Sequence, residues 1–340
     1  MTVGINDKLL AANYPAVLSR LMIEKGISST LLFEGTSFSE SKLNSPDTLV
    51  SLNEYLTLIT NVKKYSTEPA LGLHLGEALG VTTHGMTGIA AMSCKTFGEA
   101  VETASRYFVT RFPAIRVTCQ KHEHSNTFTL EDNADLGVHK RFIIESIFAS
   151  IYTIAKFLIG DNAEYFITEF TTPAAPYQES YEEIFGDSCH FERSENRMIC
   201  NAKLWPMPLQ FFDPSMRKIA IDKCDAELQE LKLKGGIRQQ VKDILRNDKQ
   251  GFPSIDMLAR QLNLSPRTIS RKLKLEKASF QEILDEERKR RAINYLTHTE
   301  LSITQITHEL NFNDSAYFTR AFKRWTGYLP SHFRKSALSK

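Results

Sequence analysis

Two stretches near the end of the sequence carry arginine, lysine, serine and threonine at helical spacing, and these side chains can bind the phosphates and base edges of DNA. Each stretch also has an apolar stripe that would face a core, which leaves the polar positions on the outer side. In the first stretch the outer positions are Arg267, Thr268, Ser270, Arg271 and Lys274. In the second they are Ser315, Ala316, Tyr317, Thr319, Arg320 and Lys323. For one stretch alone, the solvated face of an ordinary helical bundle would explain the pattern.

The two stretches belong to an internal repeat. Ser254–Leu264 reads SIDMLARQLNL and Ser302–Phe312 reads SITQITHELNF, with an offset of 48 residues. Each copy predicts a short helix that ends at an asparagine, Asn263 or Asn311, because asparagine tolerates the left-handed conformation that turns the chain. A second helix follows, and Ser265 is a suitable N-cap for the first of these. Two helix-turn-helix units at matching spacing favour insertion of a helix into the DNA major groove over the plain bundle.

The segment between the repeats predicts one amphipathic helix over Phe280–His298. Nineteen residues span about 28 Å, and successive major grooves on one side of DNA lie about 34 Å apart. Such a helix could therefore hold two recognition helices against adjacent grooves. Its basic run, Arg288–Arg291 (RKRR), suggests phosphate contacts, with Arg288 as the candidate. Ion pairs with the neighbouring Glu286 and Glu287 explain the run equally well.

Charge separates this basic part from the rest of the chain. The sequence has 340 residues and a formal net charge of +2. The segment from Gly236 to the end contains 20 Lys and Arg against 11 Asp and Glu, a net charge of +9, so the remainder carries −7. An anionic partner is therefore expected for the basic part alone. Five scattered cysteines, no signal-peptide pattern and no apolar run of about 18 residues indicate a cytoplasmic protein without a membrane partner.

The division of the chain is predicted at paired glycines, Gly235 and Gly236, which end a charged helix over Pro214–Lys234. We predict an α+β amino-terminal domain over residues 1–231, a linker over 232–236 and an all-α carboxy-terminal domain over 237–340. Glycines crowd the stretch from Gly72 to Gly88 and suggest turns and close packing. Helices in the first domain are predicted over Pro46–Tyr65, Phe97–Phe108 and His139–Leu158, and strands over Thr127–Glu131 and Tyr165–Phe170.

Other chemistry finds little support. Cys119, His122 and His124 form a C-x-x-H-x-H cluster, but a clear fourth ligand is lacking, so no metal site is predicted. Nucleophile-elbow, HExxH and phosphate-binding-loop patterns do not occur, and we predict no enzyme activity and no cofactor. Phe318, Phe322 and Trp325 share a helical stripe, which indicates core packing rather than base stacking.

Residues 237–334 resemble the DNA-binding domain of the AraC/XylS family. The second half of that range, ITQITHELNFNDSAYFTRAFKRWTGYLPSHFR, matches the family signature almost throughout. Asn311 stands where the family usually has glycine, and Lys277-Ala278 where it often has Gly-Thr. The stretch HGMTGIAAMSCKTFGEAVETASRYF (residues 84–108) resembles the arabinose-binding-like ligand and dimerisation domain of one branch of that family. The first half of residues 237–334 also matches the family at five positions, which are Arg271, Phe280, Arg288, Ala292 and Leu296.

The resemblance implies a metabolite-responsive transcription factor, expected to be an activator, that inserts two recognition helices into adjacent major grooves. Its expected partners are double-stranded promoter DNA, RNA polymerase, a small-molecule effector and a second copy of the chain. The alternative is a ligand-independent regulator whose amino-terminal domain only dimerises. The sequence identifies neither the effector nor the residues that would bind it.

Overall fold

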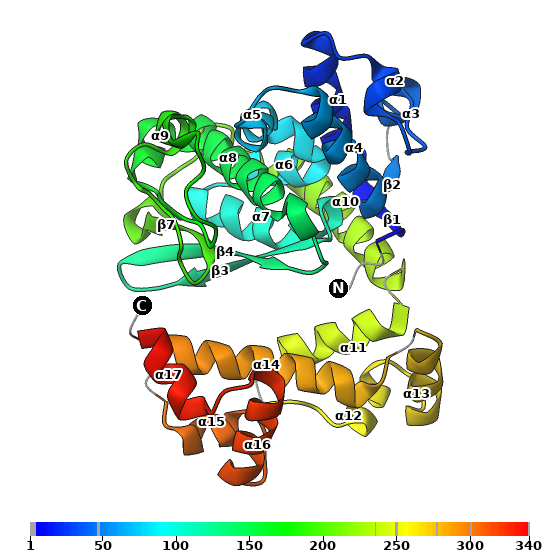
Figure 1. Ribbon diagram of the computed structural model, residues 1–340, viewed down its shortest axis with the longest axis vertical. Coiled ribbons are helices and arrows are strands. Elements are labelled where there is room, and N and C mark those ends of the chain that lie inside the picture. The colour runs from blue at the N-terminus through cyan, green and yellow to red at the C-terminus, as the bar shows by residue number, and fades with distance from the viewer. Residues whose placement is uncertain are drawn as a thin grey trace. The chain divides into compact units, whose positions relative to one another are not determined.

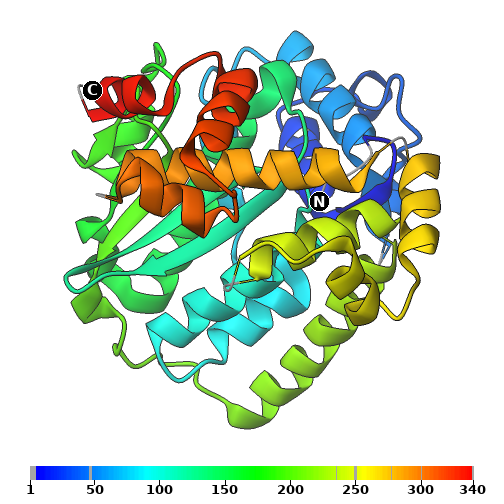
Figure 2. The ribbon, with the colours of Figure 1, turned by 90° about the horizontal axis from the view of Figure 1, so that it is seen from below.

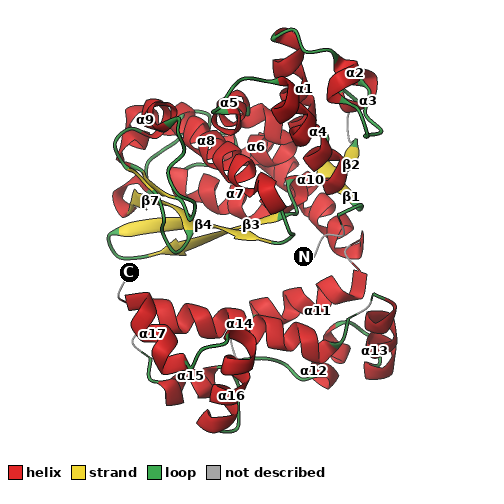
Figure 3. Cartoon of the chain, viewed as in Figure 1, coloured by secondary structure: helices red, strands yellow, loops and turns green. Residues whose placement is uncertain are grey.

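The computed structural model describes residues 5–45, 48–234, 236–248, 251–276, 278–299 and 301–338. The chain divides into two compact units, residues 2–231 and residues 232–340. Strands occur in the first unit, and the described part of the second unit consists of helices and their connections (Figures 1 and 3). An α+β domain followed by an all-α domain is therefore confirmed as the fold class.

The amino-terminal unit combines a two-stranded sheet, a five-stranded sheet and a set of covering helices. The five-stranded sheet has the order β3-β4-β7-β5-β6, and all its pairs are antiparallel except β5 with β6. Its strands are β3 (Ile115–Lys121), β4 (Ser125–Asp132), β5 (Ile167–Glu169), β6 (Cys189–His190) and β7 (Asn196–Asn201), while β1 (Lys8–Ala11) pairs with β2 (Leu49–Ser51). The α-helices are α1 (Asn13–Glu24), α2 (Ser29–Leu32), α3 (Glu40–Leu43), α4 (Leu52–Tyr65), α5 (Leu71–Ala78), α6 (Gly85–Met92), α7 (Phe97–Arg111), α8 (Lys140–Ile159), α9 (Gln178–Phe185) and α10 (Pro214–Lys234).

Several predicted boundaries in this unit need correction. The helix predicted over Pro46–Tyr65 begins at Leu52, because Ser51 and Glu54 form a capping box and Leu49–Ser51 pairs as β2; Pro46 lies outside the described residues. The strand predicted over Tyr165–Phe170 is shorter, Ile167–Glu169, since a 3-10 helix ends at Tyr165. Helix α7 extends to Arg111, three residues beyond its predicted end.

Helix α8 forms the centre of the amino-terminal core and contacts α5 along its length. Among the described residues, the segment 137–163 is the one helix long and apolar enough to cross a membrane, but 67% of its most apolar window is buried inside the protein, as in a core helix. Gly72 and Gly76 face α8 from within α5, so the turns predicted there are wrong and the predicted close packing is correct. A Cβ atom on Gly76 would lie 2.4 Å from the Cβ of Ala149 and 2.5 Å from the carbonyl oxygen of Ser146.

The carboxy-terminal unit is built around one long helix, α14 (Phe280–His298), as Figure 2 shows in orange. Helix α11 (Gly236–Asn247) packs along α14, and α17 (Pro330–Leu338) contacts it as well. The pair α12 (Ile255–Gln261) and α13 (Pro266–Leu275) lies toward one end of α14, and the pair α15 (Ile303–Glu309) and α16 (Ser315–Thr326) lies toward the other (Figure 1). The predicted turn residues Asn263 and Asn311 have φ angles of 52° and 53°, which confirms their left-handed conformation.

The close approach of α5 to α8 generates a stability prediction. Gly76→Ala should lower the free energy of unfolding by about 1–3 kcal/mol, because the new methyl group overlaps atoms of α8 that cannot move independently of the core. Gly80→Ala is the matched control, since no atom lies within 4 Å of the added Cβ there. Urea denaturation of both variants measures the difference. Equal stabilities would show that α8 gives way at this contact.

Candidate nucleic-acid interface and ligand pocket

Helix α13 buries one side and exposes the other. Ser265 caps its first turn by accepting a hydrogen bond from the amide of Thr268, and Pro266 is its first residue. Ile269 and Leu273 are fully buried in the core of the carboxy-terminal unit. Of the predicted outer residues, Thr268 is half-buried, and the exposed ones are Arg267, Ser270, Arg271 and Lys274. Lys272 is exposed as well, although the helical pattern did not single it out.

Helix α16 repeats this arrangement. Asp314 caps it through the amide of Tyr317, and Phe318 and Phe322 are fully buried, while Trp325 packs against the same core. The core role predicted for this aromatic stripe is thus confirmed. Ser315 and Thr319 are half-buried, and Ser315 accepts a hydrogen bond of 3.4 Å from the Thr307 hydroxyl. The remaining predicted residues are exposed: Ala316, Tyr317, Arg320 and Lys323.

The cations on these two outer faces have no acidic partner among the residues that the structure describes. These cations are Arg267, Arg271, Lys274, Arg320 and Lys323. By contrast, Arg324 follows on the same helix as Arg320 but pairs with Asp285 at 2.9 Å. Exposed guanidinium and ammonium groups without acidic partners can bind an external anion.

The basic run of α14 is used inside the protein instead. The Arg288 Nη2 atom donates to the carbonyl oxygen of Asn311 at 2.9 Å, and its guanidinium lies 4.5 Å from the centre of the Phe312 ring. Arg291 donates from Nη2 to the carbonyl oxygens of Leu245 (2.7 Å) and Asp248 (2.9 Å) at the end of α11. The structure thus gives Arg288 an internal partner where the sequence suggested a phosphate, and we leave it out of the proposed DNA contacts.

Glu287 is the carboxylate that these cations surround. Its side chain is 1% exposed and accepts from the Nε atoms of Arg246 at 2.7 Å and Arg290 at 3.1 Å. Burial tends to raise the pKa of Glu287, but the charges of Arg246, Arg290 and Lys242 outweigh burial and hold the pKa below its ordinary value. The sequence left two interpretations of the basic run Arg288–Arg291, phosphate contacts or ion pairs with Glu286 and Glu287. Arg290 forms such an ion pair with Glu287, while Arg288 and Arg291 bind backbone carbonyls.

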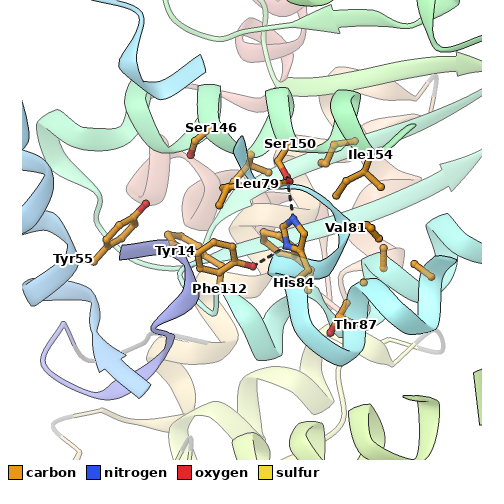
Figure 4. Close-up of a pocket in the computed structure, with 16 residues that line it drawn as sticks. Tyr14, Tyr55, Leu79, Val81, His84, Thr87, Phe112, Ser146, Ser150 and Ile154 are labelled. Carbon is orange, nitrogen blue, oxygen red and sulfur yellow. Dashed lines mark hydrogen bonds between the residues drawn. The ribbon is translucent and has the colours of Figure 1, made fainter. Parts of the chain in front are cut away.

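The amino-terminal unit contains a pocket of about 90 Å³ that sequence reasoning did not find. Figure 4 shows its side chains converging from segments that are far apart in the chain. The lining residues come from α1, α4, the segment 79–84, α6, α7, Phe112 and α8. No helical or strand periodicity could have identified them, because most are ordinary apolar residues of different elements.

The pocket holds one hydrogen-bonded chain of side chains, which starts at Tyr14 and passes through His84 to Ser150 (Figure 4). The Tyr14 hydroxyl lies 3.0 Å from Nδ1 of His84, and Nε2 of His84 lies 3.0 Å from Oγ of Ser150. Ser150 donates its single hydroxyl proton to the carbonyl oxygen of Leu79 at 2.8 Å. Nε2 must therefore carry the imidazole proton, and Nδ1 accepts from Tyr14. Burial lowers the pKa of His84 to about 4, so the ring is neutral.

The predicted C-x-x-H-x-H cluster lies at the β3-β4 hairpin. Cys119 is in β3, half-buried, and His122 and His124 are exposed around the turn. Among the described residues, no group of His, Cys, Asp and Glu side chains is arranged to hold a metal ion.

Comparison with known proteins defines the class. The arabinose-binding N-terminal domain of AraC transcription regulators matches residues 26–209, more than half of the chain, and a helix-turn-helix domain matches residues 258–336. The chain therefore belongs to the AraC family of DNA-binding transcription regulators and is not an enzyme.

Individual proteins resemble the chain over different lengths. The chain is 30% identical over 334 residues to the ornithine utilization regulator of Pseudomonas aeruginosa, with 98% of both chains covered. It is 35% identical over 96 residues to the urease operon transcriptional activator of Escherichia coli, which covers 28% of this chain and 32% of that protein. The crystal structure of the regulator CdpR from Pseudomonas aeruginosa is similar with a TM-score of 0.48 and 19% identity, covering 95% of this chain and 98% of the other.

The buried charge cluster of α14 generates a prediction with an internal control. Glu287→Gln should lower the free energy of unfolding of the carboxy-terminal unit by about 3–5 kcal/mol at neutral pH, because three cations lose a buried partner. Glu286→Gln should cost no more than about 1 kcal/mol, since that side chain is 48% exposed.

The same prediction has a pH dependence. A carboxyl group whose folded pKa is lowered contributes stability above its unfolded pKa and loses it as the pH falls through the folded pKa. The difference between the protein and its Glu287→Gln variant should therefore shrink in acid, as denaturant titrations from pH 7 downward would measure. A difference independent of pH would show that shape, and not charge, stabilises this position.

Proposed function

We propose that this protein regulates transcription by inserting α13 and α16 into adjacent major grooves of promoter DNA, under the control of a small molecule bound to its amino-terminal domain. The observation that carries the DNA-binding part is the pair of recognition helices. Both follow an asparagine in the left-handed conformation, begin at a side-chain cap and bury one face, and both expose cations that lack internal acidic partners. By contrast, Arg288 and Arg291 of α14 donate hydrogen bonds to backbone carbonyl groups within the carboxy-terminal unit.

The length of α14 supports binding to two major grooves rather than to one. Its 19 residues span about 28 Å, and adjacent major grooves on one side of B-DNA lie about 34 Å apart. Arg288 joins α14 to the turn before α16, and Arg291 joins α14 to the end of α11, a helix that contacts α13. These contacts restrict the separation of the two recognition helices. A site of about two helical turns per protomer follows.

The exposed side chains divide by chemistry. Arg267, Arg271, Lys274, Arg320 and Lys323 can reach guanine edges or phosphates, because guanine offers two acceptors in the major groove. Ser270, Thr268 and Thr319 can bind backbone oxygens, as can the hydroxyl groups of Ser315 and Tyr317. Ala316 is exposed near the start of α16, where its methyl group suits contact with a thymine methyl.

The remaining parts of the proposal rest on relatives and on the pocket. One relative is named as an activator and another as a regulator of utilization of a metabolite, which supports an activator that responds to an effector and contacts RNA polymerase. The pocket, with walls that are mostly apolar, favours this sensor over a regulator whose amino-terminal domain only dimerises. The proposal includes that the protein acts in the cytoplasm as a homodimer bound to promoter DNA.

Two substitutions test the two-groove arrangement. Arg271→Ala and Arg320→Ala should each weaken specific binding by about 1–3 kcal/mol, with the loss concentrated at one base position, if these side chains read bases. The two affected positions should lie about one helical turn apart. Lys95→Ala, which removes an exposed cation from the amino-terminal unit, is the control for net charge.

Footprinting on promoter DNA measures the length of the protected site, and binding to DNA variants with single-base changes measures the loss at each base position. Protection of about two turns per protomer agrees with the proposal. Protection confined to one turn would contradict it, and an equal loss for all DNA sequences would reassign the arginine concerned to a phosphate contact.

A further inference from the structure

The pocket has a chemical character that restricts its ligand. Its sixteen lining residues include no aspartate, glutamate, lysine or arginine, and its one titratable base, His84, is neutral and bonded at both nitrogens. Most of the wall consists of aliphatic and aromatic side chains from α6, α7 and α8. A charged ligand would lose its hydration here without gaining a partner, which costs several kcal/mol per ion.

The free hydrogen-bonding capacity of the network is that of an acceptor. The Tyr14 hydroxyl donates to His84, so its oxygen retains an unused lone pair. The Ser150 oxygen accepts from His84 and donates to Leu79, and it also retains one lone pair. A ligand that reaches this chain therefore needs a hydrogen-bond donor, such as a hydroxyl group.

The volume sets the size of the ligand. An apolar cavity of about 150 Å³ holds benzene, which has six carbon atoms. In proportion, the 90 Å³ found here accommodates about four non-hydrogen atoms. From charge, donor requirement and size together, we propose that this pocket binds a short aliphatic alcohol of about three carbons, with its hydroxyl at Tyr14 and Ser150 and its chain against α8. This proposal rests on the proposed function, because it specifies the effector class.

The contacts of the pocket helices α6 and α7 with α10 offer a route by which such a ligand would be sensed. Thr87 lines the pocket from α6, and its hydroxyl lies 3.8 Å from Sγ of Cys224 in α10. Tyr107 of α7 donates to Asp225 at 2.7 Å. Arg111, at the end of α7, binds Glu227 at 2.6 Å. Helices α6 and α7 thus form the pocket with one face and hold α10 with another, and α10 continues to Lys234, where the carboxy-terminal unit has begun.

A matched series of ligands tests the inference on the full chain. We expect 1-propanol to shift the methyl NMR signals of Ile147, Ile151 and Ile154 in a saturable manner. Propionate, propylammonium and L-ornithine, the metabolite in the name of a relative, should leave these signals unchanged at ten times the concentration. Tyr14→Phe should weaken 1-propanol binding by about 3- to 10-fold, the loss of one hydrogen bond. Tyr55→Phe should not, although Tyr55 also lines the pocket, because its hydroxyl lies outside the His84 chain.

Three outcomes would overturn the inference. Propionate or propylammonium binding as tightly as 1-propanol would refute an uncharged ligand, and equal effects of the two tyrosine variants would refute the role of the Tyr14 oxygen. Absence of shifts with every ligand would refute a small-molecule site at this position. Because promoter footprinting on the same preparation is independent of these signals, failure here with intact two-turn protection would leave the DNA-binding proposal standing.

Discussion

The DNA-binding unit depends on the contacts of two half-buried arginines of α14. Arg288 joins the turn of the second helix-turn-helix to α14 through the Asn311 carbonyl, and Arg291 joins α14 to the end of α11 through three carbonyl groups. Both guanidinium groups also lie over the ring of Phe252, which precedes α12. Carbonyl oxygens and aromatic faces satisfy a guanidinium without a second charge, so the planar donors of arginine suit this place and the point charge of lysine does not. The spacing of the recognition helices follows from these contacts.

The two units solve the problem of buried polar groups differently. In the carboxy-terminal unit the buried carboxylate of Glu287 is balanced by surrounding cations, and the cluster is electrically costly to break. In the amino-terminal pocket the buried base is neutral, and its hydrogen bonds run in one direction from Tyr14 through His84 to Ser150 and Leu79. The first arrangement rigidifies a scaffold. The second leaves acceptor positions unused, which is what a binding site for a neutral donor requires.

The sequence predicted the carboxy-terminal unit almost completely because local signals agreed there. Caps at Ser265 and Asp314, asparagines that turn the chain, and apolar stripes at helical spacing all indicate the same helices. The fate of the basic run could not be decided in the same way, since the carbonyl partners of Arg288 and Arg291 lie 23 to 46 residues away. In the amino-terminal unit, the glycines of α5 suggested turns. Glycine is needed there because the backbone of α8 lies against α5, and α8 is about 70 residues further along the chain. The capping box at Ser51 and Glu54 was a local signal that could have placed the start of α4.

Helices α6 and α7 connect the pocket to α10. Thr87 of α6 lines the pocket and contacts Cys224 of α10, while Tyr107 and Arg111 of α7 bind Asp225 and Glu227 of α10. Packed interfaces adopt discrete arrangements and do not deform continuously. The coupling that we propose is therefore a shift of α10 between two such arrangements when the ligand binds, and α10 carries it to Lys234, where the carboxy-terminal unit has begun.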